Sequence, residues 1–555
     1  MARRAALSLP EGRAAPFALL ITATVLLFLG GLGHLPLFGR DEALYAEAGR
    51  EMLASGDWVT PRVNGGPFLE KPPLLYWLAA ASFRVLGAHP FAARLPAALL
   101  AILTVVLTVR IGARAWGRRA GLLARIALAT SLQMVLIGRM GIMDVPLTCL
   151  TVLALLAYER WRTRPGIMVT IGLGACFAFG VLLKGLAGLI GLSIVVLDVL
   201  IGIAGGRRTR PSAILLLYLA LAIFIAIAAP WFLAMNARHG QAFTSTLFLQ
   251  EHLRRMVQPM QGHGGPFWIY LPLIAVSFFP WVMFLPSAFI TVRRAGSESA
   301  GFWRRLSIIW IAYVLVLFSL VATKLPGYVT PLFPAMALLV GAELDRRLER
   351  PGRGPWLAVL IGSVVLAAAV ALLPAAGARL GARVGAAQQA RALVLPVAVW
   401  MIGYGVIAAG AAAALLGRAR VGLGLLVAGQ VVVVAAVLFG ILPVLSPYLG
   451  GGSAQLAQRA QQELPGSRIV LYDTRPETVN FVLQRPVPTF GDTQRRELLE
   501  ALRAGPTALI APVTEEGFWR KLPVRRVWRA GDRVLLDLPR LNDAPAPVRG
   551  MRVVG

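Results

Sequence analysis

The sequence has little charge and almost no cysteine. Charged residues make up 15% of its 555 residues, whereas soluble domains carry about 25%, and its mean hydropathy is +0.71. These values exclude an ordinary soluble protein and indicate an integral membrane protein. The two cysteines, Cys149 and Cys176, both lie in apolar runs, which excludes a disulfide framework and a cysteine-based metal site.

Acidic residues are also scarce, because 26 Asp and Glu stand against 55 Lys and Arg, a formal charge of +29. Nucleic-acid binding can produce such an excess, but these arginines form short clusters between apolar runs, as in the cytoplasmic loops of multi-span proteins. At about 17–25 residues per crossing, the runs predict an all-α polytopic membrane protein with about 13 transmembrane helices. With a cytoplasmic N-terminus the inner loops are basic, as at Arg110, Arg114, Arg118 and Arg119, and at Arg346, Arg347, Arg350 and Arg353.

The same alternation places the less apolar segments outside, which for a bacterial chain is the periplasm. We expect a transmembrane domain at 1–445, with outer loops at about 37–90 and 234–266, and a periplasmic α/β domain at 446–555. In this second domain, "SRIVLYDT" and "PTALIAPV" are typical of buried strands, "TQRRELLEALRAG" of a helix, and "VRRVWRAGDRVLLDL" of two strands around a turn. It contains neither a phosphate loop nor a metal-ligand spacing, so its sequence indicates no chemistry.

The first outer loop is unusually acidic for a segment that follows a membrane span. Asp41 begins a predicted helix to Ser55, so one interpretation is that Asp41 caps the helix. The later acids, Glu47 and Glu51, would then form a solvated face. The other interpretation is a polar cavity, because Asp41 and Tyr45 are four residues apart and share a helix face. Glu42 and Tyr45 are expected to line that cavity together with Glu70.

A second cluster follows at Glu70 and Lys71, directly before Pro72 and Pro73. The two prolines stiffen the backbone and delay the next helix, so they hold an acid–base pair at the membrane surface. One interpretation is a salt-bridged interfacial loop with Trp77 as an aromatic anchor. The alternative is that Lys71 presents a fixed cation to a lipid phosphate.

The second outer loop contains three of the five histidines of the chain. Arg254 and Arg255 are candidate phosphate-binding residues, because a guanidinium group matches phosphate geometry. An amphipathic helix on anionic headgroups is the competing interpretation. A divalent metal such as zinc, held by Glu70, His252 and His263, is a further alternative, although the spacing is no recognised zinc signature.

Three further charged residues lie near the ends of predicted spans and are functional candidates by default. Asp144 begins the fourth span, Lys184 follows the fifth, and Lys324 precedes Tyr328 across a Pro-Gly turn. Together with Lys71 and the two arginines, Lys324 could stabilise a phosphate leaving group, while Asp41 could orient or deprotonate an acceptor. The residues therefore predict an outward-facing cavity suited to anionic lipids.

Several motifs of the sequence resemble those of a known family. The motifs "GRDEALYAEAGREML", "FLEKPPLLYWL", "ARLPAAL", "GRMGIMDVPL", "GVLLKGLAGL" and "SLVATKLPGYVTPLFPAMALL" look like those of the lipid A aminoarabinose transferases. That family lies within the protein O-mannosyltransferase-like, GT-C class of polyprenyl-phosphate-dependent glycosyltransferases. The likeness covers about the first 345 residues.

The resemblance implies transfer of 4-amino-4-deoxy-L-arabinose from undecaprenyl phosphate to lipid A phosphates at the periplasmic face of the inner membrane, which gives resistance to polymyxin and cationic peptides. It implies catalytic roles for Asp41 and Asp144. It also implies that Lys71 holds the carrier phosphate. Lys324 and Tyr328 correspond to a later Lys-Leu-Pro-x-Tyr turn of the family. The expected partners are the lipid-linked sugar donor, lipid A and the bilayer, with a monomeric protein and no nucleic acid.

Two alternatives remain open from sequence. One is another polyprenyl-phosphate glycosyltransferase that acts on a protein or a glycan. The other is a lipid transporter, although transporters place polar groups near the midplane of the membrane within internal repeats. Here the charges gather at one face, and the sequence shows no repeat.

Overall fold

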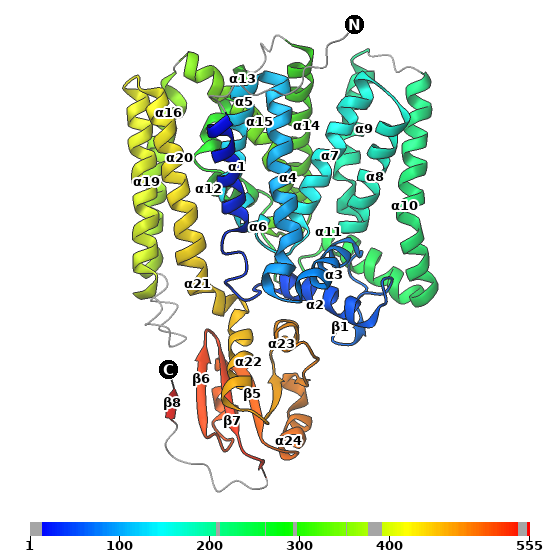
Figure 1. Cartoon of the computed structure of the whole chain (residues 1–555), viewed down its shortest axis with the longest axis vertical. Helices are drawn as coiled ribbons and strands as arrows, with labels where there is room; N and C mark the ends of the chain where they lie inside the picture. The colour runs from blue at the N-terminus through cyan, green and yellow to red at the C-terminus, as the bar shows by residue number, and fades with distance from the viewer. Residues whose placement is uncertain are drawn as a thin grey trace.

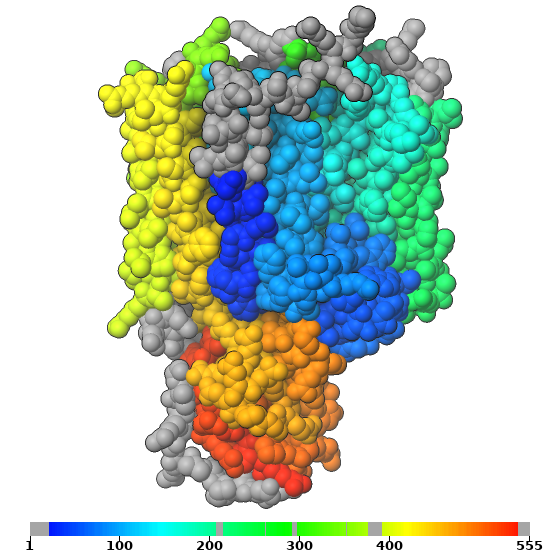
Figure 2. All heavy atoms as spheres, in the orientation of Figure 1, coloured from blue at the N-terminus to red at the C-terminus, as the bar shows by residue number. Residues whose placement is uncertain are grey.

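A computed structural model describes residues 14–206, 211–260, 262–291, 297–350, 352–375, 391–541 and 552–554 of the chain. Within these residues, long apolar helices form a bundle, and a smaller domain with a β-sheet lies beyond one end of it (Figure 1). The space-filling view shows the second domain as a narrower extension below the wide bundle (Figure 2).

The helices of the bundle follow the apolar runs of the sequence, because a backbone in lipid must satisfy its own hydrogen bonds. They are α1 (Ala14–Leu29), α4 (Pro90–Trp116), α5 (Arg118–Ala129), α6 (Leu132–Gly138), α7 (Asp144–Thr163), α8 (Ile167–Lys184), α9 (Ile190–Ala204), α10 (Pro211–Thr244), α12 (Tyr270–Ser277), α13 (Leu285–Thr291), α14 (Glu298–Leu320), α15 (Phe333–Glu349), α16 (Arg353–Ala371), α19 (Val394–Leu415) and α20 (Ala419–Ala436). The predicted polytopic helical fold is confirmed.

Eight helical stretches of the described residues are long and apolar enough to cross a membrane, or up to 10 if each of two sharply bent helix pairs is one span. This number is below the predicted 13 for identifiable reasons. The stretch at Ile167–Ala204 contains α8 and α9, which were predicted as separate crossings. In addition, α1 has only 16 residues, and α7 carries charged residues at both ends.

The segments predicted to lie outside the membrane gather at the end of the bundle nearest the sheet (Figure 1). They are α2 (Arg40–Ser55), the hairpin of β1 (Arg62–Val63) and β2 (Gly66–Pro67), α3 (Leu74–Leu86), the π-helix η2 (Ser245–Arg254), α11 (Arg255–Val257) and the 3₁₀-helix η5 (Pro326–Leu332). Residues far apart in sequence therefore meet at this end.

Two predictions for α2 are wrong. Gly39, with φ +78°, is the N-cap residue instead of Asp41, and no side chain caps the helix. Glu47 and Glu51 are buried rather than solvated. Their charges are compensated, because Glu47 pairs with Arg50 at 2.6 Å and Glu51 accepts a hydrogen bond of 3.0 Å from the Gly65 amide.

The C-terminal domain is a six-stranded mixed sheet in the order β4-β3-β5-β7-β6-β8. Its elements are α22 (Gly451–Glu463), β3 (Arg468–Tyr472), α23 (Glu477–Leu483), β4 (Thr489–Phe490), α24 (Arg495–Arg503), β5 (Thr507–Pro512), β6 (Arg526–Ala530), β7 (Arg533–Leu538) and β8 (Arg552–Val554). Strand β3 pairs in parallel with β4 and β5, and β5 pairs antiparallel with β7. The four predicted strands and the predicted helix are present, while residues 542–551 and 555 of the predicted domain lie outside the described residues.

The sheet domain is attached to the nearer end of the bundle by direct contacts. The Gly39 amide donates a hydrogen bond of 2.6 Å to the carbonyl of Leu449, just before α22. Helix α23 packs on α2 and α3, where the rings of Phe481 and Phe83 are 5.7 Å apart. The first turn of α2 therefore lies between the bundle and the sheet domain.

Candidate active site

The end of the bundle nearest the sheet domain contains a cluster of ion pairs built from five separate segments. Lys71 lies just before α3, and its ammonium group pairs with the carboxylate of Glu251 on η2. Arg255, one helical turn further on, pairs with the same carboxylate at 3.1 Å. Two cations thus pair with one buried anion.

The cluster continues from Arg255 to Tyr328 and Asp144. The Arg255 guanidinium donates a long hydrogen bond of 3.4 Å to the Tyr328 hydroxyl. The Lys184 ammonium lies 5.2 Å from the centre of the Tyr328 ring and pairs with Asp144 at 2.7 Å. The structure therefore brings together Lys71, Arg255, Tyr328 and Asp144, which lie in four different segments of the sequence.

The turn before Tyr328 requires glycine for steric reasons. A Cβ atom on Gly327 would lie 2.7 Å from the carboxyl carbon of Asp144, closer than side chains normally approach. The amide of Gln133 donates to the carbonyl of Pro326 at 2.7 Å and fixes the same turn. The Pro-Gly sequence therefore lets the turn pass close to the carboxyl group of Asp144.

Asp41 lies in the first turn of α2 and is exposed. No hydrogen bond or ion pair of Asp41 occurs within the part of the chain that the structure describes. Burial raises the pKa of the neighbouring Tyr45 hydroxyl well above its usual value, and the charge of Asp41 adds to the rise. The Tyr45 and Tyr76 rings are 5.8 Å apart. Asp41 thus presents an uncompensated carboxylate beside two neutral phenols.

Burial also affects the acid–base pair before α3. It raises the pKa of Glu70, with a further rise from Glu251, while Lys71, Arg40 and Arg255 act in the opposite direction. Burial lowers the pKa of the Lys71 ammonium, and the charge of Glu251 opposes this change. An anion that enters the cluster would favour the charged form of Lys71, because an opposite charge at short range raises the pKa of a lysine.

Several predicted site residues have other contacts. The Lys324 ammonium donates to the carbonyls of Phe318, Ser319 and Val321 at the end of α14, so its three hydrogens are engaged. Arg254 is exposed and bonds to Gln258 at 3.2 Å. In this geometry neither residue joins the Lys71 cluster as a phosphate ligand.

Glu42, predicted to line the substrate cavity, has no exposed surface. Arg94 donates two hydrogen bonds of 2.8 Å to its carboxylate and three more to the carbonyls of Leu32, Leu35 and Pro36. The amides of Phe38 and Gly141 also donate to Glu42, each at 3.0 Å. The prediction for Glu42 is therefore corrected. Its carboxylate is enclosed by these donors and, together with Arg94, holds the segment before α2 in place.

The three residues predicted to bind zinc do not form a site. No group of three His, Cys, Asp or Glu side chains within the described ranges could hold a metal ion. Both ring nitrogens of His252 are engaged, one with the Leu247 carbonyl and the other with the Leu186 amide at 3.0 Å. Glu70, His252 and His263 therefore do not fit the proposed ligand set.

Two residues of the cluster, Glu251 and Lys184, are not among the site residues predicted from the sequence. One signal could have identified the lysine. The chain has only four lysines, Lys71, Lys184, Lys324 and Lys521, and the first three lie in predicted outer loops or turns. Because nearly all other basic residues are arginine, the restriction of lysine to these positions marks the three lysines as candidate site residues.

Known proteins resemble this chain both in sequence and in fold. A family model described as dolichyl-phosphate-mannose-protein mannosyltransferase matches residues 70–233, from Glu70 onward. A Pectobacterium carotovorum protein named undecaprenyl phosphate-alpha-4-amino-4-deoxy-L-arabinose arabinosyl transferase is 33% identical over 374 residues, which cover 63% of this chain and 65% of that protein. A Pseudomonas fluorescens arabinosyl transferase of the same name, numbered 2, is 32% identical over 366 residues, with 64% and 61% covered. The matched region thus spans less than two thirds of these relatives.

The structural likeness extends over nearly the whole chain. The crystal structure of ArnT from Cupriavidus metallidurans bound to undecaprenyl phosphate has a TM-score of 0.75 at 24% identity, covering 94% of this chain and 98% of the other. Its apo structure gives the same TM-score at 23% identity. The GT-C type fold and the resemblance to the aminoarabinose transferases are therefore confirmed.

Proposed function

We propose that this protein is a glycosyltransferase of the bacterial inner membrane. In this proposal it transfers 4-amino-4-deoxy-L-arabinose from undecaprenyl phosphate to lipid A phosphate groups at the periplasmic face. The added amino sugar lowers the negative charge of lipid A and so confers resistance to polymyxin and cationic peptides. The names of its sequence relatives support the donor and the sugar.

The observation that carries the proposal is the pair of cations on Glu251. Lys71 and Arg255 each have a buried ion pair with this carboxylate, and Asp41 is exposed at the neighbouring helix start. A carrier phosphate could bind to the two cations as an additional anion, because guanidinium and ammonium groups form strong charge-assisted hydrogen bonds with phosphate. The cations would then stabilise the phosphate as it leaves.

The proposed reaction needs little base strength. An oxygen of the lipid A phosphate is already anionic at neutral pH, so it can attack the anomeric carbon of the sugar without losing a proton. The bond from this carbon to the carrier phosphate breaks, and undecaprenyl phosphate leaves. In this scheme Asp41 orients the incoming sugar or acceptor, and the paired Asp144 keeps Lys184 and Tyr328 in position.

Expression in a polymyxin-sensitive bacterium tests the proposal, provided that the strain makes the lipid-linked donor but lacks its own transferase. We expect mass spectrometry of lipid A to show added aminoarabinose, together with an increased polymyxin tolerance. Unmodified lipid A, with the protein detected in the membrane, would contradict the proposal. Aminoarabinose on a protein or another glycan instead would support the alternative acceptor.

A further inference from the structure

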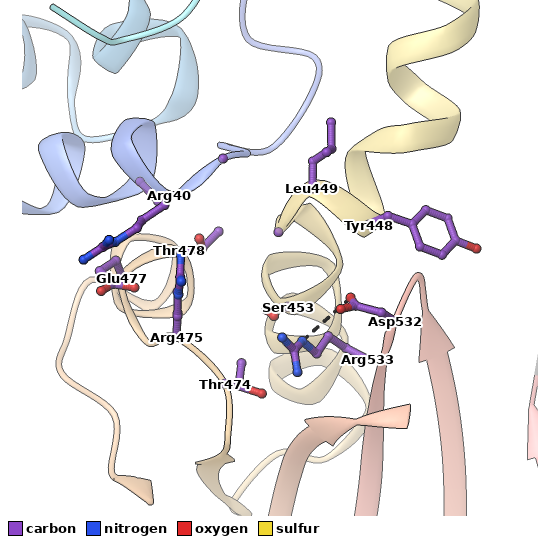
Figure 3. Close-up of a pocket in the computed structure, with 13 residues that line it drawn as sticks. Arg40, Tyr448, Leu449, Ser453, Thr474, Arg475, Glu477, Thr478, Asp532 and Arg533 are labelled. Carbon is purple, nitrogen blue, oxygen red and sulfur yellow. Dashed lines mark ion pairs between the residues drawn. The ribbon is translucent and has the colours of Figure 1, made fainter. Parts of the chain in front are cut away.

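A cavity lies at the start of α2, between the bundle and the sheet domain. It has a volume of about 310 Å³ and is lined by residues of both domains (Figure 3). Gly39 and Arg40 contribute from α2, and Gly450 and Ser453 from the start of α22. The β3–α23 connection and the β6–β7 turn complete the wall. The Lys71 cluster described above does not use this cavity.

The side chains that line the cavity carry three guanidinium groups and two carboxylates, those of Glu477 and Asp532, so cations are in excess. Arg40, Arg475 and Arg533 contribute guanidinium groups from three different elements, and Figure 3 draws Arg475 between the other two. Arg533 pairs with Asp532 at 3.7 Å. In the described parts of the chain, Arg40 and Arg475 have no ion pair or hydrogen bond. Two guanidinium groups are therefore available to a ligand with phosphate geometry.

Two hydroxyl groups of buried residues support the same conclusion. Ser453 is 5% exposed and Thr478 is 8% exposed, and both line the cavity. Neither side chain forms a hydrogen bond with another of the described residues. Both hydroxyl oxygens keep accessible surface, so they can form hydrogen bonds with an occupant of the cavity. Furthermore, α2 and α22 both begin at the cavity without a side-chain cap, which leaves amide groups and a positive dipole end near it.

The position of the cavity suggests which anion it binds. Arg40 lines the cavity and Asp41, the next residue, belongs to the candidate active site. Consecutive side chains on a helix point about 100° apart, so the start of α2 separates two anion-binding regions. An acceptor with two phosphate groups could place one phosphate in each region.

We propose that this cavity binds the acceptor phosphate that is not being glycosylated, through Arg40, Arg475 and the hydroxyls of Ser453 and Thr478. This inference rests on the proposed function, because it assumes a phosphorylated glycolipid acceptor. Binding at this position would select acceptors with two phosphates over those with one. It would also give the sheet domain a role in recognising the acceptor.

The experiment compares bisphosphorylated with monophosphorylated lipid A as acceptors for the purified full-length protein in detergent micelles. We expect the KM of the wild type to be about tenfold lower for the bisphosphorylated than for the monophosphorylated acceptor, because the monophosphorylated lipid lacks one charge-assisted contact. In Arg40→Gln and Arg475→Gln the ratio of the two KM values should fall towards one. Arg496→Gln, whose side chain is 94% exposed on α24, is the matched control and should keep the wild-type ratio.

A binding measurement separates failure of this inference from failure of the proposed function. Titration of the same proteins with each lipid A by intrinsic tryptophan fluorescence does not require transfer. Preference of the wild type for the bisphosphorylated lipid, lost in Arg475→Gln, would support the inference even if no sugar were transferred. Equal affinity for both lipids, or an unchanged preference in both arginine variants, would overturn it. Full displacement of the lipid by millimolar inorganic phosphate would also overturn it, because the cavity would then be a site for free phosphate.

Discussion

Replacement of Lys71 by methionine is expected to reduce sugar transfer by about 10²- to 10³-fold, the usual cost of removing one charge-stabilising group from an active site. Methionine keeps most of the length of the side chain but has no positive charge to compensate the negative charge of a phosphate. The folded state should survive, because Glu251 retains its ion pair with Arg255 at 3.1 Å. Initial rates of transfer to lipid A, measured at equal amounts of folded protein, test this expectation.

Lys521→Met is the matched control, since Lys521 is an exposed lysine of the C-terminal domain. It should leave the rate unchanged. A Lys71→Met variant with full activity would remove Lys71 from the active site. Equal losses in both variants would indicate a general effect of removing a lysine.

Replacement of Arg94 by methionine is expected to destabilise the protein by about 3–5 kcal/mol, as for removing one partner of a buried ion pair. Glu42 has no exposed surface and would lose two hydrogen bonds of 2.8 Å. The three carbonyls before α2 would lose their donor as well. Thermal unfolding in detergent, followed by tryptophan fluorescence, should show a clearly lower Tm.

Arg84→Met provides the comparison, because Arg84 is exposed on α3 and such substitutions usually change stability by less than about 0.5 kcal/mol. The double variant Glu42→Gln/Arg94→Met should be more stable than Arg94→Met alone, since the unpaired charge is gone. An Arg94→Met variant with the Tm of the wild type would contradict the structural role given to the pair.

The architecture was predictable because long apolar runs and basic loops are local features of the sequence. The strands and the helix of the C-terminal domain were predictable for the same reason. Burial of the acidic residues on α2 was not predictable, because the segments that cover them are distant in the sequence. Arg50, which pairs with Glu47, donates to the carbonyl of Gln484, a residue 434 positions away. A pattern of acids on one helix cannot reveal such a covering segment.

The contacts of individual side chains at the candidate site could not be predicted from the sequence either. Arg254 and Arg255 are adjacent in sequence and looked equivalent. In the structure, however, Arg255 pairs with Glu251 at 3.1 Å, whereas Arg254 is exposed and bonds to Gln258. Lys324 has the sequence context of a site residue, yet the end of α14 supplies three carbonyl groups to its ammonium. The motif indicated the correct end of the bundle but did not determine which cations remain available.

The central claim is that the outer cluster transfers a sugar from a polyprenyl phosphate to a lipid A phosphate. The most direct measurement reconstitutes the purified protein in liposomes with undecaprenyl-phosphate-linked aminoarabinose and lipid A, and follows both lipids by mass spectrometry. We predict that glycosylated lipid A and free undecaprenyl phosphate appear in equal amounts and at the same rate. Intact donor and unmodified lipid A, in the presence of folded protein, would contradict the claim.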